Sequence, residues 1–139
     1  INNIRNFIAS YGVSLELVEN RFFDIKKNKI EHIIIDGSLG NSIILGKEIS
    51  NNSINFSKLI GKLLINKKEV YSNSASTILG DPLNALLWYF DKKLSLNKFI
   101  KKDEIISLGS ITPLLWIDYP CNVEAGIDGL GKCSINFVD

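Results

Sequence analysis

The sequence has little of what marks several large classes of protein. Its two cysteines, Cys121 and Cys133, are too few for a disulfide framework and lack the C-x-x-C spacing of zinc or thioredoxin sites. Apolar runs, such as residues 33–35, are far shorter than the ~18 residues of a membrane span. The first residues do not form a secretory signal. We therefore expect a reduced, cytoplasmic protein without a membrane partner.

An excess of one charge is also missing. Sixteen basic and fifteen acidic residues give a net charge of +1, and the lysines fall in scattered pairs, which disfavours a nucleic-acid partner. The 139 residues, 45% of them hydrophobic, are enough for one folded domain, which we place over residues 1–139. Because the chain begins with Ile1 and contains no methionine, we expect it to be cleaved, cut or incompletely represented.

Hydrophobic spacing predicts short strands and two helices. Apolar residues at i, i+3, i+4 and i+7 predict a helix over residues 4–11. Asp81 followed by Pro82 is typical of an N-cap and first position, and Leu83, Leu86, Leu87 and Phe90 form the apolar stripe of that second helix. Strands are predicted at 13–18, 30–35, 41–45, 56–65, 69–72, 104–108, 114–117, 122–126 and 134–138, with a loop at 51–53. The sum predicts an α+β, β-rich fold, in which a curved mixed sheet or barrel-like roll carries two short helices.

Few residues carry chemistry when they are taken alone. The only histidine, His32, lies in the predicted strand 30–35, where a packed or edge histidine is commoner than a ligand. No G-x-S-x-G elbow or phosphate loop is present. Glu16 lies between Leu15 and Leu17, which take the opposite face of a strand. Its carboxylate is either solvated, the commoner case, or placed in a barrel mouth, where a cation or hydrogen bonds must offset its desolvation.

Residues 79–88 carry a family resemblance. They read L-G-D-P-L-N-A-L-L-W, which resembles the "LG-x-P-x-N-A-x-x-W" segment of the 2-keto-4-pentenoate hydratases. Those enzymes, with 4-oxalocrotonate decarboxylase, form part of the fumarylacetoacetate hydrolase superfamily. Residues 101–110 and 123–131 resemble the family's "L-x-x-G-D-I-I-L-T-G" strand and its closing hairpin. Residues 14–18 are similar to "A-[IL]-E-[IV]-V", and Arg21 and Asp24 fit the segment that follows it. The match covers this whole chain but only the C-terminal half of a typical member.

The resemblance implies a fold, an activity and a site. It implies a fumarylacetoacetate hydrolase-like fold and a metal-dependent hydratase, which adds water to a 2-keto-4-enoate or 2-hydroxydienoate in aromatic catabolism. Glu16 matches one of three glutamates that bind Mg²⁺ or Mn²⁺; the other two form an E-x-E pair in the first half. Ser38 matches a serine near the substrate and is the implied catalytic residue. Gly109 and Ser110 are expected to line the pocket of a small 2-keto acid.

Departures from the family pattern leave the activity open. Only fifteen residues precede Glu16, so the E-x-E pair has no counterpart, and a single carboxylate is too few for a strong magnesium site. The metal is therefore expected only if that pair is supplied. The first hypothesis is half of a hydratase or decarboxylase, whose N-terminal half is cut away, disordered or contributed by a partner chain. The alternatives are an inactive hydratase-like domain retained as a binding or structural module, and a non-enzymatic subunit of a larger complex. We also expect a homo-oligomer.

Overall fold

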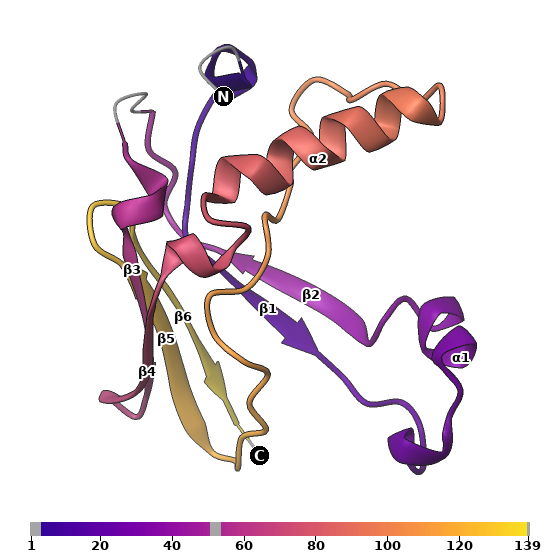
Figure 1. Ribbon diagram of the computed structural model, residues 1–139. Helices are drawn as coiled ribbons and strands as arrows, with labels where there is room; N and C mark the ends of the chain where they lie inside the picture. Colours follow the sequence, from indigo (N-terminus) through magenta and orange to yellow (C-terminus); the bar gives the residue numbers. More distant parts are fainter. Residues whose placement is uncertain (1–3, 51–53, 139) are drawn as a thin grey trace.

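The strands form two antiparallel sheets in the computed structural model, which describes residues 4–50 and 54–138 (Figure 1). A two-stranded ribbon pairs β1 (Ser14–Val18) with β2 (Gly40–Leu45). The larger sheet has the order β4–β3–β5–β6, with bounds β3 (Ile60–Ile65), β4 (Lys68–Ser74), β5 (Cys121–Ile127) and β6 (Gly131–Phe137). Both ribbon strands contact β6. The α+β class is confirmed, and over the described residues the two sheets stay open rather than closing into a barrel.

The two α-helices of the described residues lie in different parts of the fold. The short α1 (Ile30–Ile35) lies at the far end of the β1–β2 ribbon, whereas α2 (Pro82–Ser95) lies near the body of the molecule (Figure 1). Four 3-10 turns complete the structure: η1 (Ile4–Phe7), η2 (Ile25–Lys27), η3 (Phe56–Lys58) and η4 (Ala75–Thr77). No helix among the described residues has the length and apolar character needed to cross a membrane.

Helix α2 begins where the sequence predicts. The backbone N–H of Leu83 donates a hydrogen bond to Asp81 Oδ1 at 2.8 Å, and Pro82 occupies the first turn, where a missing N–H is harmless. The side-chain amide of Asn84 donates to the carbonyl of Leu79 at 2.9 Å and so closes the turn that leads into the helix. The N-cap interpretation of Asp81 is confirmed.

The apolar face of α2 lies at the centre of the main core. Leu83 is fully buried and Leu86 is 5% exposed, while Leu87 and Phe90 pack at the edge of the same cluster. The other buried members come from distant segments: Ile4, Val13, Phe56, Leu130 and Cys133. A second cluster of Leu63, Cys121 and Val123 covers one face of the larger sheet. Since α2 joins the N-terminus to the β5–β6 hairpin, its packing holds most of the chain together.

Residues 30–35 form a helix, so the predicted strand is wrong. The N–H of Ser38 donates to the carbonyl of Ile33 at 2.7 Å, and the N–H of Gly37 donates to that of Ile34 at 3.1 Å. With Gly37 at φ 85°, these two bonds form the Schellman motif that ends a helix. The isoleucines favour a strand, but β1 and β2 already pair with each other. His32 is therefore an exposed helical residue, not part of an apolar strand.

The expected strands at 104–108 and 114–117 do not form, and the first helix is shorter than predicted. Residues 99–117 run over the larger sheet as an irregular segment, in which Ile111 packs onto Gly61 of β3. A Cβ at Gly61 would lie 2.9 Å from Ile111 Cδ1, so a larger residue at this position would force the Ile111 side chain to shift. Within this segment Ile111 thus packs against the sheet, and no strand pairing forms. Near the N-terminus, only η1 is helical, because Tyr11 pairs with Ile49 through two backbone hydrogen bonds and is extended.

Both predicted hairpins are present. The turn between β3 and β4 places Asn66 and Lys67 at positive φ, as a tight two-residue connection requires, and β5 and β6 pair along their whole length. Residues 56–58, expected to begin the first hairpin strand, form η3 instead. The loop predicted at residues 51–53 lies outside the described residues.

Replacing Leu86 by aspartate should unfold the domain. Burying a leucine side chain stabilises by about 1.5–3 kcal/mol, and a buried, unpaired carboxylate adds a desolvation cost. We expect Leu86→Asp to show no cooperative transition in urea. Leu94→Asp, at an exposed position on the same helix, should retain a transition close to that of the original chain. A cooperatively folded Leu86→Asp protein would contradict the packing of α2.

Asp81→Ala should reduce the free energy of unfolding by about 0.5–2 kcal/mol, because it removes the hydrogen bond to the first turn of α2. Asp91→Ala is the matched control, since Asp91 is exposed on the same helix; we expect a change within about 0.5 kcal/mol. Urea unfolding followed by circular dichroism measures both. Equal stabilities of the two variants would contradict the role of Asp81 as an N-cap.

Candidate functional site

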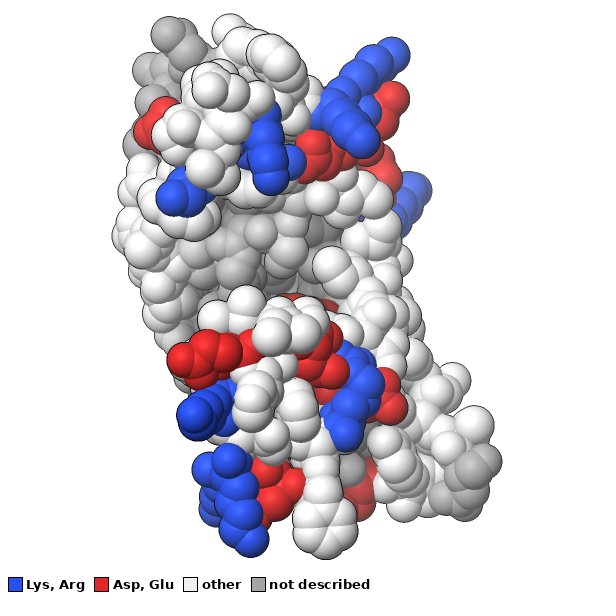
Figure 2. Space-filling view, turned by 90° about the vertical axis from the view of Figure 1, so that its right-hand side faces the viewer, with Lys and Arg blue, Asp and Glu red and all other residues white. Residues whose placement is uncertain are grey.

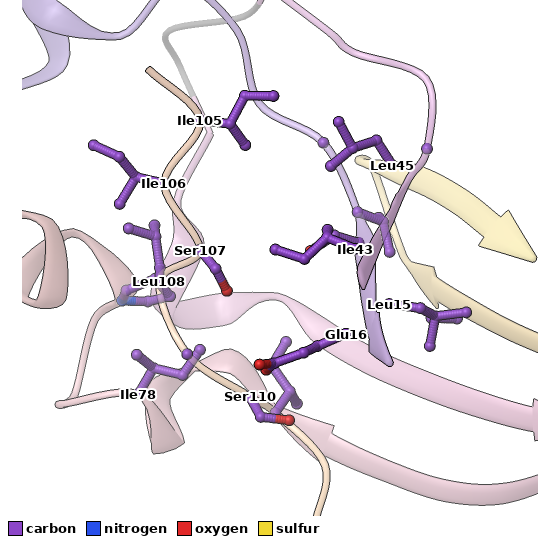
Figure 3. A pocket seen from close by; sticks show the side chains of 18 of the residues that line it. Leu15, Glu16, Ile43, Leu45, Ile78, Ile105, Ile106, Ser107, Leu108 and Ser110 are labelled. Carbon is purple, nitrogen blue, oxygen red and sulfur yellow. The ribbon is translucent and has the colours of Figure 1, made fainter. Parts of the chain in front are cut away.

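A cavity of about 1460 Å³ lies between the ribbon, α2 and the irregular segment 99–117. On the face shown in Figure 2 the molecule is hollowed between two groups of charged side chains, and the hollow itself is lined mainly by uncharged residues. Apolar side chains supply most of the wall seen in Figure 3: Ile43, Leu45, Ile78, Ile105, Ile106 and Leu108. A wall of this kind suits the carbon chain of a small organic ligand.

Glu16 brings a carboxylate into this cavity from β1. In the ribbon it stands opposite Ile43 of β2, and the alternation of the strand sends Leu15 to the other side. Figure 3 shows the Glu16 side chain pointing toward Ser107 and Ser110. Glu16 is exposed to solvent. Its orientation agrees with the predicted one, while its role as a metal ligand stays a prediction.

Gly109 and Ser110 form part of the opposite wall. Gly109 adopts φ 120°, a backbone conformation that residues with a Cβ rarely accept, and its Cα faces the side chain of Ile78. The hydroxyl of Ser110 donates to the carbonyl of Thr112 at 2.7 Å, which leaves its oxygen as an acceptor. Both residues line the cavity, and their part in a substrate pocket stays a prediction.

Ser38 reaches the cavity from the turn between α1 and β2. A salt bridge holds this turn: Arg21 Nη2 lies 2.7 Å from Asp36 Oδ2 and Arg21 Nε lies 2.9 Å from Oδ1. The same guanidinium donates to the carbonyls of Asp36 and Gly40. These hydrogen bonds keep the pKa of Asp36 below its usual value and raise the pKa of Arg21. Arg21 therefore fixes the backbone on both sides of Ser38.

A polar cluster that the sequence analysis missed anchors the other wall. Glu104 Oε1 accepts hydrogen bonds from the hydroxyl of Tyr89 and, at 3.2 Å, from Lys93 Nζ, while Oε2 accepts from the N–H of Lys101 at 2.9 Å. The Tyr89 hydroxyl first, and then the Lys101 N–H, lower the pKa of Glu104 to about 2. Tyr89 and Lys93 lie four residues apart on one face of α2, and that spacing was the available signal.

The described residues do not by themselves fit a magnesium site. Among them, no group of three His, Cys, Asp or Glu side chains is close enough to hold a metal ion. Glu16 offers one carboxylate, and the carboxylate of Asp36 is engaged by Arg21. Magnesium is bound through oxygen ligands in near-octahedral geometry and usually keeps several waters, so one protein carboxylate gives only a weak site.

Sequence comparison relates the chain to hydratases. It is 27% identical over 125 residues to 2-keto-4-pentenoate hydratase of Paraburkholderia xenovorans, a match covering 89% of this chain and 46% of that protein. It is 26% identical over 125 residues to 2-hydroxyhexa-2,4-dienoate hydratase of Comamonas testosteroni, covering 89% and 47%. The chain thus spans about half the length of the curated relatives it matches. No family model matches the chain.

Structural comparison points to the same group of folds. The chain superposes on 4-oxalocrotonate decarboxylase of Pseudomonas putida G7 with a TM-score of 0.76 in its complex with magnesium and adipate, and 0.74 in its complex with calcium and acetate. Each match has 20% identity and covers 87% of this chain, but only 46% and 45% of the decarboxylase. The resemblance to the 2-keto-4-pentenoate hydratases and the fumarylacetoacetate hydrolase-like fold are confirmed. The likeness extends over about half of a relative.

Acid should weaken the anchor at Glu104. Its pKa of about 2 lies below the ordinary 4.5, so its contribution to stability is present above about pH 4.5 and is lost as the pH falls toward 2. We expect the urea midpoint of the original chain to fall more between pH 6 and pH 3 than that of Glu104→Gln. Tyr89→Phe should lose less stability than the original chain over the same range, because its loss also begins near pH 4.5 but ends at a higher pH once the largest cause of the lowered pKa is gone. Equal acid sensitivity in all three proteins would rule out this role.

Proposed function

We propose that this chain forms half of a metal-dependent hydratase, which adds water to a 2-keto-4-enoate or 2-hydroxydienoate, as in aromatic catabolism. One observation carries the proposal. Four residues that the family resemblance marks, Glu16, Ser38, Gly109 and Ser110, come from three distant parts of the sequence and line one cavity. Identities of 26–27% to two hydratases support the same class of reaction.

Each wall of the cavity has a part in this proposal. The apolar side chains hold the carbon chain of the substrate and exclude water from it, and the glycine at position 109 lets the backbone come close. The hydroxyl of Ser38 provides a hydrogen-bond donor for a keto or carboxylate oxygen, whereas Ser110, whose proton is donated to Thr112, lines the pocket beside it. Glu16 contributes one oxygen ligand to a Mg²⁺ or Mn²⁺ site whose other ligands come from outside the described residues. When bound, such an ion supplies Lewis-acid stabilisation of negative charge.

A second candidate is an inactive hydratase-like domain that serves as a binding or structural subunit. The absence of a three-ligand group among the described residues favours it. So does the turn at Ser38, where Asp36 is committed to Arg21. The two candidates differ in one measurable respect, because only the first requires Glu16 for turnover once the remaining metal ligands are present. A homo-oligomer is compatible with both and stays a prediction.

The isolated chain should bind Mn²⁺ no more tightly than millimolar, because Glu16 alone leaves most coordination positions to water. Titration calorimetry measures this, with Glu16→Gln as the comparison and Glu69→Gln, on the distant strand β4, as the control. Micromolar binding that depends on Glu16 would show that this chain holds further ligands. We also expect no hydratase activity from the isolated chain.

Turnover decides between the two candidates. When the chain is assembled with a complementary hydratase half, Glu16→Gln should abolish hydration of 2-hydroxypenta-2,4-dienoate, followed by loss of the dienol absorbance, while the circular dichroism spectrum is unchanged. An assembled protein without activity would favour the inactive subunit.

A further inference from the structure

The chain exposes far more surface than its mass predicts. A folded monomer of 15.5 kDa is expected to expose about 7200 Å². This chain exposes 9844 Å², an excess of about 2600 Å². Permanent interfaces bury about 1000–2500 Å² on each partner, so the excess corresponds to a domain-sized neighbour and not to a peptide.

Part of the exposed apolar surface lies on the irregular wall of the cavity. Phe99, Ile105, Leu114 and Trp116 are between 54% and 84% exposed, and each lines the cavity. They belong to one segment, residues 99–117, which makes no ladder with any described strand. Exposed apolar side chains that share one cavity wall are typical of an interaction site.

The cavity is also too large for the proposed substrate. Ligand pockets usually enclose about 300–1000 Å³, and this one measures about 1460 Å³. A small 2-keto acid would leave much of it filled with water against apolar walls. Part of the volume is therefore suited to protein side chains that enter from outside.

We propose that the cavity face formed by residues 99–117 is the docking surface for a second polypeptide segment, and that this segment fills the outer part of the cavity. This second segment corresponds to the part of the hydratases that the chain does not match. In the Paraburkholderia xenovorans enzyme that part is more than half of the protein. The inference rests on the proposed function and specifies which face of the chain the other half covers. The segment presents apolar side chains to this face and places oxygen ligands near Glu16.

Co-expression tests the docking surface. The probe is the part of the Paraburkholderia xenovorans hydratase outside the matched segment, co-expressed with this chain and isolated through a tag on the probe. In the isolated complex, amide hydrogen exchange should slow over residues 99–117, and over β4, on the distant edge of the sheet, it should stay unchanged. Phe99→Glu should lower the yield of complex about tenfold. Val70→Glu, an exposed residue of β4 outside the cavity wall, should leave the yield within about twofold.

Three outcomes would contradict the proposed docking surface. The first is that no complex forms, and the second is a complex in which amide exchange over residues 99–117 is unchanged. The third is an equal loss of complex yield in Phe99→Glu and Val70→Glu. Protection of the same residues in the isolated chain that rises with its concentration would assign the face to a second copy. Both variants replace exposed residues, so a folding failure is not expected, and circular dichroism checks it. A complex that forms through residues 99–117 but has no hydratase activity would refute the proposed function and leave the docking surface standing.

Discussion

Burial of the leucine face of α2 is the interaction on which the rest of the structure depends. Leu83 and Leu86 contact residues from the N-terminal turn, η3 and the β5–β6 hairpin, segments more than a hundred residues apart in the sequence. The helix can take that place because Asp81 and Pro82 fix where it begins. The ribbon contacts the larger sheet along β6, and the core around Leu83 and Leu86 adds packing between the N-terminal turn, η3 and the β5–β6 hairpin.

Two charged clusters hold parts of the cavity wall in place. Tyr89 and Lys93 hold Glu104 and with it the start of the wall segment, while Arg21 holds the turn that carries Ser38. Both clusters are partly solvent-accessible, so each ion pair contributes little stability on its own. Their effect is geometric: each ties an irregular piece of backbone, which lacks a ladder of its own, to an element with regular hydrogen bonds.

The sequence predicted the features that local chemistry determines. The start of α2, its buried face, the two hairpins and the inward direction of Glu16 follow from capping, spacing and strand alternation. Residues 30–35 and 104–117 were mispredicted because β-branched residues favour strands without determining them. In the first case the Schellman turn at Gly37 ends a helix, a signal present in the sequence. In the second, the segment finds a sheet face rather than a free edge, which only the tertiary structure determines.

These observations meet in the cavity. Hydrogen bonds hold parts of its walls in place, whereas the described residues offer few groups that could bind a metal. Arg21 and Glu104 anchor parts of its walls, and Gly109 keeps a backbone conformation that only glycine readily adopts. Yet no group of three metal-binding side chains includes Glu16 among the described residues, apolar side chains face solvent, and the volume exceeds that of an ordinary ligand site. The partner proposed above would account for all three features, since a chain that covered residues 99–117 would also reduce the volume and approach Glu16. The open cavity and the exposed surface are thus one property of the chain.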